Sequence, residues 1–346
     1  MTMPALEKEG FIKFNRDLYQ NRIEPLIDPT LTSFKKILKS HTLFNCFFLL
    51  LIAGELLYFF VHVTLFVQTF VIAIHLALIF ATMFCYFTLQ MYAHDRKTEQ
   101  LMNLVSAFVT ACRQAAPTLE EMPERTLLVA EACCKLAITL HGQESHVYAC
   151  PSWCIFLSSS LEKLNIWWFW RDVHCIQELL LQHCVDEHIR LVRAEPTDVE
   201  AHAGLASAYV MLSGLYVDPK TVEGWDDDRW IPRGKYNESF QQKFRATAER
   251  AIEEFKILSD YAPHDPWVHA QLAYSYRDLQ MPHEEIKEYE TILHLCPEDK
   301  ETLFKLGKLY FSQGQNAKGL QIYEALRKSN SKRAEALIRF YGAYTA

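Results

Sequence analysis

The chain has 346 residues and a formal net charge of −7, from 35 Lys and Arg against 42 Asp and Glu. This acidic balance argues against a nucleic-acid-binding surface, so we expect no nucleic-acid partner. Ten Cys in a sequence without a secretory signal are typical of reduced thiols, which argues against a protein held together by disulfides.

Residues 1–42 are predicted to form an N-terminal cytosolic arm. Leu31, Phe34 and Leu38 recur at spacings of three and four residues, as on one face of a helix. The arm is polar overall, but its end has helical potential.

An apolar segment follows from Leu43 to Tyr92, in which Glu55 is the one residue with a formal charge. Such a length suffices for two membrane spans of about 20 residues each. We place the spans near residues 43–63 and 66–87 and predict a two-helix transmembrane hairpin over residues 43–92. A hairpin buried in a soluble core is the alternative, and the length of the segment favours the membrane.

Flanking charges predict the orientation of this hairpin. Lys35, Lys36 and Lys39 precede the first span, and Arg96 and Lys97 follow the second. The connection between the spans contains no Lys or Arg, so the positive-inside rule places both termini in the cytoplasm. The expected localisation is that of a multi-pass membrane protein whose C-terminal part faces the cytosol.

Glu55 is a candidate functional group, because ionisable residues inside a membrane span are costly. It would either pair with a residue such as His75 or remain neutral and hydrogen-bonded within the hairpin or between protomers. Two short spans supply too few polar residues for a transport pathway, so we favour the second interpretation.

Residues 93–170 are predicted to form a helical connector, and Ala93–Cys112 continues the second span as a helix. Cys150 and Cys154, with His146 nearby, lack a second Cys pair at ligand spacing. We therefore expect no metal and no cofactor.

The connector ends on an aromatic cluster that consists of Trp167, Trp168, Phe169 and Trp170. Trp is favoured in the headgroup region of a membrane, so the cluster could dip into that region. The alternative is that it begins a long helix and covers the core in front of the C-terminal helices. We favour the core.

Residues 171–346 contain a repeated pattern. Three residue pairs lie 34 positions apart: Leu272 and Leu306, Tyr276 and Tyr310, Tyr289 and Tyr323. Small and aromatic residues occupy the matching positions around these pairs. The residues expected to pack the helices against each other are Leu205, Ala206, Tyr209, Ala251, Phe255, Leu272, Ala273, Tyr276, Tyr289, Leu306, Gly307, Tyr310, Gly319 and Tyr323.

This pattern resembles the tetratricopeptide (TPR) repeat, a helix-turn-helix unit of 34 residues. The resemblance implies an all-α fold, in which the transmembrane hairpin is followed by a TPR-like α-solenoid of about three to four helix pairs. Two positions depart from the family pattern. Glu285 occupies a place where a small residue is expected, and Ser331 replaces the closing Pro, so we expect a closing helix from Ser331 to Tyr344.

One helix pair is interrupted by about 33 extra residues at positions 213–243. This insertion contains a possible recognition element made of Trp225, Asp226, Asp227, Asp228 and Trp230. The ligand pattern of a helix-loop-helix calcium site is absent. The acidic run is therefore predicted to be either a solvated loop or a recognition element for a basic partner.

The resemblance also implies a concave groove lined by the first helix of each pair. The matching positions are Glu200, Ala203, Ser207, Trp267, Ala270, Tyr274, Arg277, Asp278, Glu301, Phe304, Lys308 and Phe311. This mixture of apolar and charged residues suits an extended peptide or a helix of a partner. One TPR subfamily binds chaperone C-terminal carboxylates with Lys and Asn, but the matching places here hold Ala203, Ser207, Gln271, Glu301 and Lys305. We therefore expect no chaperone tail as a partner.

The sequence contains no phosphate-binding Gly loop, no His-Glu-x-x-His helix and no Gly-x-Ser-x-Gly turn, so we do not expect an enzyme. The favoured function is a membrane-anchored protein–protein interaction scaffold at a bacterial inner membrane. An alternative follows from the two close hydrophobic lobes, which resemble those of inclusion-membrane proteins from chlamydia-type intracellular bacteria. In that case the chain would be a secreted effector that binds host proteins at the inclusion membrane.

Overall fold

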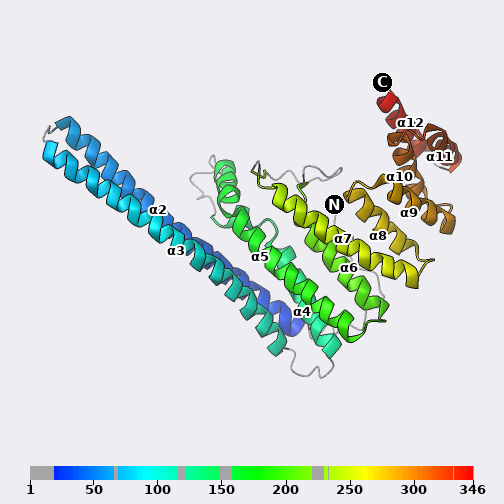
Figure 1. Cartoon of the computed structure of the whole chain (residues 1–346), viewed down its shortest axis with the longest axis horizontal. Coiled ribbons are helices and arrows are strands. Elements are labelled where there is room, and N and C mark those ends of the chain that lie inside the picture. Colours follow the sequence, from blue (N-terminus) through cyan, green and yellow to red (C-terminus); the bar gives the residue numbers. More distant parts are fainter. Residues whose placement is uncertain are drawn as a thin grey trace. The chain divides into compact units, whose positions relative to one another are not determined.

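The computed structural model describes residues 19–65, 69–115, 122–148, 158–219, 230–232, 234–329 and 331–345. Within these ranges every secondary-structure element is a helix (Figure 1). The chain forms two compact units, an N-terminal one built mainly from residues 13–184 and a C-terminal one built mainly from residues 185–346. The division falls within helix α5 (Ser158–Ala194).

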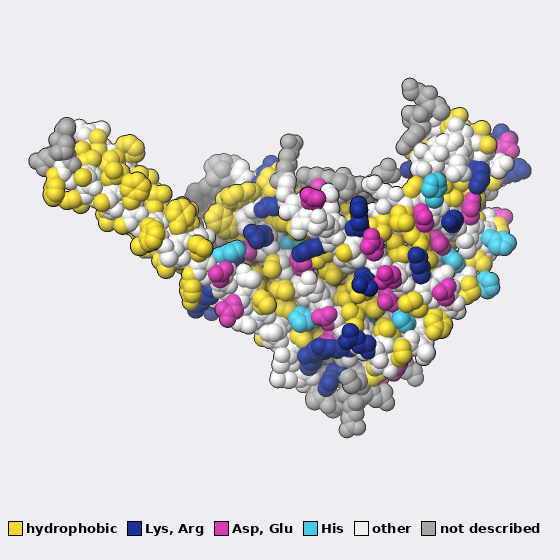
Figure 2. Space-filling view, in the orientation of Figure 1, with side chains coloured by type: hydrophobic (Ala, Val, Ile, Leu, Met, Phe, Trp, Pro, Cys, Tyr) yellow, Lys and Arg dark blue, Asp and Glu magenta, His cyan; other side chains and the backbone are white. Residues whose placement is uncertain are grey.

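The N-terminal unit contains a hairpin of two long helices, α2 (Ile27–Leu65) and α3 (Thr69–Ala115), shown side by side in Figure 1. Both are long and apolar enough to cross a membrane, with mean hydropathies of 2.2 and 2.3 in their apolar windows. Only 0% and 6% of these windows is buried within the structure, whereas a core helix of a soluble protein is mostly buried. Hydrophobic side chains cover most of the visible hairpin surface (Figure 2).

Both helices extend beyond the predicted spans. Short turns at Tyr19–Ile23 and Glu24–Leu26 lead into α2, which then runs without a break across position 42. Helix α3 likewise continues past Tyr92 to Ala115, as the lack of Gly or Pro there predicts. The end of the hairpin away from its connection is therefore helical in both arms.

Polar side chains pair across the hairpin. The Thr82 hydroxyl donates a hydrogen bond of 2.8 Å to Glu55 Oε1, and the Tyr86 hydroxyl donates one of 3.2 Å to Asn45 Oδ1. Within α3, His75 Nδ1 lies 2.7 Å from the carbonyl oxygen of Val71, one turn earlier. Glu55 is thus hydrogen-bonded within the hairpin through Oε1, which agrees with the hydrogen-bonding part of the favoured interpretation.

The hairpin continues into a core that includes α4 (Met122–Leu140), a short helix at Gln143–His146, and α5. The Gln177 side chain on α5 donates to the carbonyl oxygen of Ala137 on α4, at 2.9 Å. Lys97 on α3 forms an ion pair of 2.7 Å with Asp172 on α5. These contacts join both later helices to the base of the hairpin.

The aromatic cluster on α5 is divided between two environments. Phe169 and Trp170 are 2% and 6% exposed, whereas Trp167 and Trp168 are 53% and 38% exposed. The core interpretation therefore holds for Phe169 and Trp170 and is wrong for Trp167 and Trp168. The two pairs differ because successive helical positions point to different faces.

The C-terminal unit is a TPR-like α-solenoid of helix pairs. The pairs are α6 (Val199–Gly214) with α7 (Glu238–Tyr261), α8 (Pro266–Asp278) with α9 (Pro282–Leu295), and α10 (Lys300–Ser312) with α11 (Asn316–Ser329). A last helix, α12 (Ser331–Thr345), packs on the third pair where the closing helix is expected.

Each first helix of a pair begins at the same signal. Asp198, Asp265 and Asp299 cap α6, α8 and α10, and each carboxylate accepts a hydrogen bond from the backbone N–H two residues later. A Pro stands two residues before each Asp. The Pro ends the preceding helix and the Asp starts the next, which fixes the length of the turn.

The predicted repeat-packing residues lie in the cores between these helices. Twelve of them are buried, and Tyr209 and Tyr323 are partly buried against the same clusters. Two glycines allow close approach. A Cβ atom on Gly319 would lie 2.5 Å from the Phe311 ring, and one on Gly307 would lie 2.7 Å from Leu337 Cδ2 on α12.

The insertion separates Gly214 at the end of α6 from Glu238 at the start of α7. Trp225 and the acidic run from Asp226 to Asp228 lie outside the described residues. Trp230 is 41% exposed. The role of the insertion in recognition stays a prediction.

Candidate interaction surface on the helical repeats

The first helices of the second and third pairs present a mixed aromatic and charged face. On α8, Trp267, Tyr274 and Arg277 follow each other at spacings of seven and three, which places them on one side of the helix. On α10, Glu301 and Lys305 are four residues apart and likewise adjacent. We call these five residues the α8–α10 surface.

Tyr274 lies at the centre of this surface. Lys305 Nζ donates a hydrogen bond of 3.0 Å to the Tyr274 hydroxyl and lies 4.9 Å from the ring centroid. The Arg277 guanidinium lies 5.4 Å from the same centroid. Two cations thus surround one aromatic ring, at distances typical of cation–π contacts.

Acidic groups partly neutralise these cations. Lys305 Nζ forms an ion pair of 2.7 Å with Glu301, and Arg277 lies 3.5 Å from Asp278. Burial disfavours the charge on Lys305, but hydrogen bonds to Glu301 and Tyr274 outweigh that effect and raise its pKa. The hydrogen bond from Lys305 lowers the pKa of Glu301. Lys305 is therefore held in place by its neighbours, whereas the Arg277 side chain remains 47% exposed.

Trp267 adds an apolar element. It is 39% exposed, and its ring lies edge-on to the Phe255 ring at a centroid distance of 6.1 Å. One side of the indole is therefore fixed by the core, and the other remains accessible. A rigid, half-exposed aromatic residue of this kind can anchor a partner at low entropic cost.

Ten of the twelve predicted groove residues are at least partly exposed on first helices; these are Glu200, Ser207, Trp267, Ala270, Tyr274, Arg277, Asp278, Glu301, Phe304 and Lys308. Ala203 and Phe311 are 8% and 3% exposed, so neither is available to line a groove. Phe311 occupies the position that Arg277 holds one repeat earlier, but the Tyr341 ring on α12 lies tilted against its ring, at a centroid distance of 4.6 Å. The end of the stack thus buries a position that is exposed in its middle.

Glu285 on α9 is buried and forms a polar cluster behind this surface. Desolvation raises its pKa to about 7, although Arg277 and a hydrogen bond with Tyr289 oppose the shift. Desolvation likewise raises the pKa of Asp278 on α8. Because Glu285 replaces the small residue of the repeat pattern, its carboxyl group lies beside Arg277.

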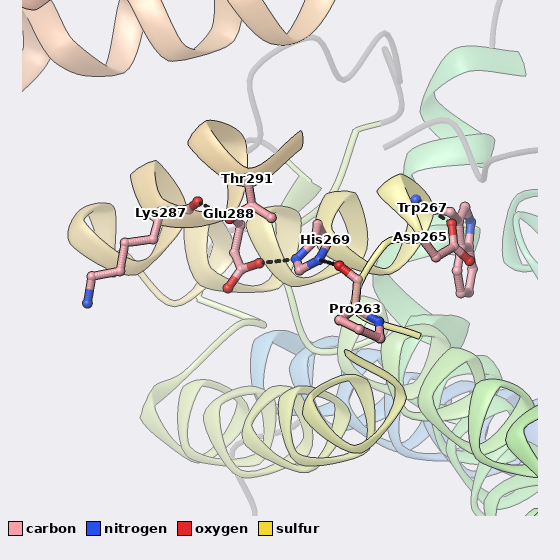
Figure 3. A network of polar contacts seen from close by, with 7 residues as sticks. All are labelled: Pro263, Asp265, Trp267, His269, Lys287, Glu288 and Thr291. Atoms are coloured by element: carbon pink, nitrogen blue, oxygen red, sulfur yellow. Dashed lines mark hydrogen bonds and ion pairs between the residues drawn. The ribbon is translucent and has the colours of Figure 1, made fainter. Parts of the chain in front are cut away.

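Two buried His residues also join the helices of a pair, and the sequence alone did not reveal them. His269 Nδ1 lies 2.7 Å from Glu288 on α9, and its Nε2 lies 3.0 Å from the carbonyl oxygen of Pro263 (Figure 3). His202 makes the same contacts in the first pair. The available signal was a His at equivalent positions of two repeats, each six residues after the Pro.

Cys150 and Cys154 lie outside the described residues. Within the described ranges, no group of three or more His, Cys, Asp or Glu side chains is placed to hold a metal ion.

No protein-family model matches the sequence, and comparison with curated proteins finds no match. Among solved structures, the chain is similar to TTC0263, a thermophilic TPR protein in Thermus thermophilus, with 17% identity and a TM-score of 0.33, over 75% of this chain and 95% of that chain. It is also similar to the human IFIT1 dimer with m7Gppp-AAAA, with 12% identity and a TM-score of 0.34, over 70% of this chain and 61% of that chain. The chain thus spans less than two thirds of IFIT1, and these similarities concern the fold alone.

The expectation of no nucleic-acid partner is wrong as an exclusion. It depended on net charge, whereas the similar IFIT1 structures contain the capped RNAs m7Gppp-AAAA and Gppp-AAAA.

Proposed function

We propose that this chain is a membrane-anchored scaffold whose helix pairs bind an extended segment of a partner protein. Residues 43–92 would hold it in a bilayer through two spans, with both termini in the cytoplasm. The α8–α10 surface would bind the partner. The observation that carries the proposal is that Trp267, Tyr274 and Arg277 are at least partly exposed on one side of α8. The sequence contains no catalytic motif that would favour an enzyme instead.

The anchor is supported by the exposure of the hairpin. Apolar windows of hydropathy 2.2 and 2.3 that are 0% and 6% buried would face water if no membrane surrounded them. Exposed apolar area of this extent is unfavourable in water and favourable in hydrocarbon. The hydrogen bond from Thr82 to Glu55 also satisfies one carboxyl oxygen of the charged residue in the segment.

The binding surface is supported by its rigidity and its donors. Lys305 contacts both Glu301 and Tyr274, and contacts that order these side chains before a partner arrives lower the entropy cost of binding. Arg277 presents a partly exposed guanidinium that can donate to carbonyl or carboxylate oxygens of a partner. A partner segment with both apolar and oxygen-rich groups fits this chemistry.

The test of the binding surface is affinity capture of the full-length chain from its native host after crosslinking, with quantitative mass spectrometry. The variant Tyr274→Ala with Arg277→Ala should lose specific partners. The matched control is Tyr261→Ala with Arg250→Ala, because these side chains are 56% and 66% exposed on α7, a second helix. If the first variant keeps every partner and only deletion of residues 213–243 releases them, the insertion is the binding element.

The test of the anchor is fractionation of the same host. The chain should remain in the membrane pellet after alkaline carbonate extraction, and release into the supernatant would reject the hairpin as a transmembrane element. A signal on the bacterial envelope supports an inner-membrane scaffold, and a signal on a host vacuole supports the effector alternative.

A further inference from the structure

Helix α5 has an exposed aromatic and basic face that neither the hairpin nor the α8–α10 surface uses. Leu164, Trp167 and Trp168 are 54%, 53% and 38% exposed. Together with exposed Arg171 they follow at spacings of three, one and three, so they share one side of the helix. Exposed Lys163 borders this side, and exposed Glu162 precedes it. We call Leu164, Trp167, Trp168 and Arg171 the α5 face.

Contacts on both hairpin helices place this part of α5 at the base of the apolar segments. Lys97 follows the second span and forms its ion pair of 2.7 Å with Asp172, one turn beyond Trp168. Lys39 precedes the first span, and its Nζ lies 5.7 Å from the Tyr148 ring centroid. The backbone oxygen of Tyr148 in turn accepts a hydrogen bond of 2.9 Å from Asn165 on α5.

The two lysines define a level relative to a bilayer. Lys and Arg next to the ends of membrane spans lie in the headgroup layer, where they contact phosphate groups. On α5, Asn165 is joined to Lys39 through Tyr148, and Asp172 forms the ion pair with Lys97. Trp167 and Trp168 lie between these two residues on the helix and therefore at the level of the lysines. Trp is the residue most favoured there, since its ring is apolar and its N–H can reach a polar partner.

We propose that the α5 face lies in the headgroup layer of the bilayer that the hairpin spans, as an interfacial membrane contact in addition to the two spans. The occupant of the face is the surface of an anionic bilayer. Trp167, Trp168 and Leu164 enter the boundary between headgroups and acyl chains, and Arg171 and Lys163 contact lipid phosphates. This inference rests on the proposed anchor and adds an attachment that would hold α5 against the membrane.

The experiment uses the full-length chain in proteoliposomes of phosphatidylcholine and phosphatidylglycerol, with and without lipids brominated near the top of the acyl chain. Bromine quenches Trp fluorescence at short range, and the chain has seven Trp. Quenching should fall by at least half in Trp167→Phe with Trp168→Phe, a variant that keeps aromatic packing and removes the fluorophores. Trp267→Phe is the matched control, because Trp267 is 39% exposed in the C-terminal unit and should leave the quenching unchanged.

Two outcomes would overturn the inference. The first is bromine quenching that is equal in the wild type and the Trp167→Phe, Trp168→Phe variant while both resist alkaline carbonate, since the anchor would stand without the α5 contact. The second concerns the oligomeric state in detergent. If the wild type is a dimer and the Trp167→Gln, Trp168→Gln variant is a monomer, the α5 face joins two copies of the chain instead of contacting lipid. Release of both proteins by carbonate would instead reject the anchor itself.

Discussion

His202 on α6 and His269 on α8 make the same two contacts in successive helix pairs. Each Nδ1 faces a carboxylate on the second helix, Glu254 at 2.6 Å or Glu288 at 2.7 Å. Each Nε2 faces the carbonyl oxygen of the Pro that precedes the first helix, at 3.1 and 3.0 Å. One ring thus ties together both helices of a pair and the turn before them.

The His–Glu contact should contribute measurably to the stability of a helix pair. Replacing His269 by Leu, the residue present one repeat later at position 303, should lower the local free energy of unfolding by about 1–3 kcal/mol. The reason is that Glu288, whose side chain is only 19% exposed, loses its partner. Hydrogen exchange of α8 and α9 peptides measures the change. The matched control is a double-mutant cycle with Glu288→Gln, and strictly additive effects would show that the two side chains do not interact.

Glu285 makes the stability of the second helix pair depend on pH. Its pKa is about 7 in the folded chain, against 4.5 for the ordinary group, so the folded state holds the proton more tightly between these values. Stability should therefore be greatest at low pH within this window and fall as pH rises to about 7, by about 3 kcal/mol at most. Arg277 and Asp278 on α8 and Tyr289 on α9 face the carboxyl group.

Glu285→Gln removes this titration and keeps the shape of the side chain. Hydrogen exchange of α9 between pH 5 and pH 8, corrected for intrinsic rates, should show a slope in the wild type and none in the variant. Equal slopes in both proteins would assign the pH dependence to another group.

The turns inside two helix pairs differ at one position. Gln280 and Gly314 lie 34 residues apart, and both have a left-handed backbone, with φ of 57° and 70°. Gly314→Gln should lower stability by about 1 kcal/mol, because side chains with a Cβ disfavour this conformation. Gln280→Gly should raise it by less, because Gly also increases the entropy of the unfolded chain. Thermal unfolding measures both, and Gly214→Gln, where the backbone is not left-handed, is the control.

The 34-residue spacing predicted the helix pairs because it reports a local and regular requirement. Leu272 and Leu306, for example, fill the same place between neighbouring helices, and both are 2% exposed. Features that depend on the ends of the stack or on tertiary contacts were not predictable in this way. Phe311 is buried between Gly319 on α11 and Tyr341 on the closing helix α12. The exposure of Trp167 beside buried Phe169 depends on how α5 packs. Equivalent sequence positions therefore do not guarantee equivalent exposure.

Gly319 should tolerate no larger side chain, in contrast to Gly342. A Cβ on Gly319 would lie 2.5 Å from the Phe311 ring, whereas one on Gly342 meets no atom within 4 Å. Gly319→Ala should lower stability by about 1–3 kcal/mol, because the ring must shift within a packed core. Gly342→Ala should leave stability unchanged or raise it slightly, since Ala favours the helix. Similar melting temperatures for the two variants would contradict the close approach of α10 and α11.

Cysteine reactivity should differ sharply between the two units. Burial raises the pKa of Cys134 to about 12, with a further increase from Glu131, whereas Cys296 is exposed at the end of α9. At pH 8 the thiolate fraction of Cys134 is about one in ten thousand, so iodoacetamide should modify Cys296 long before Cys134. Peptide mass spectrometry after timed alkylation gives both rates. Rapid modification of Cys134 in the folded chain would show that α4 opens readily, and acceleration only after denaturant is added would confirm that burial protects the thiol.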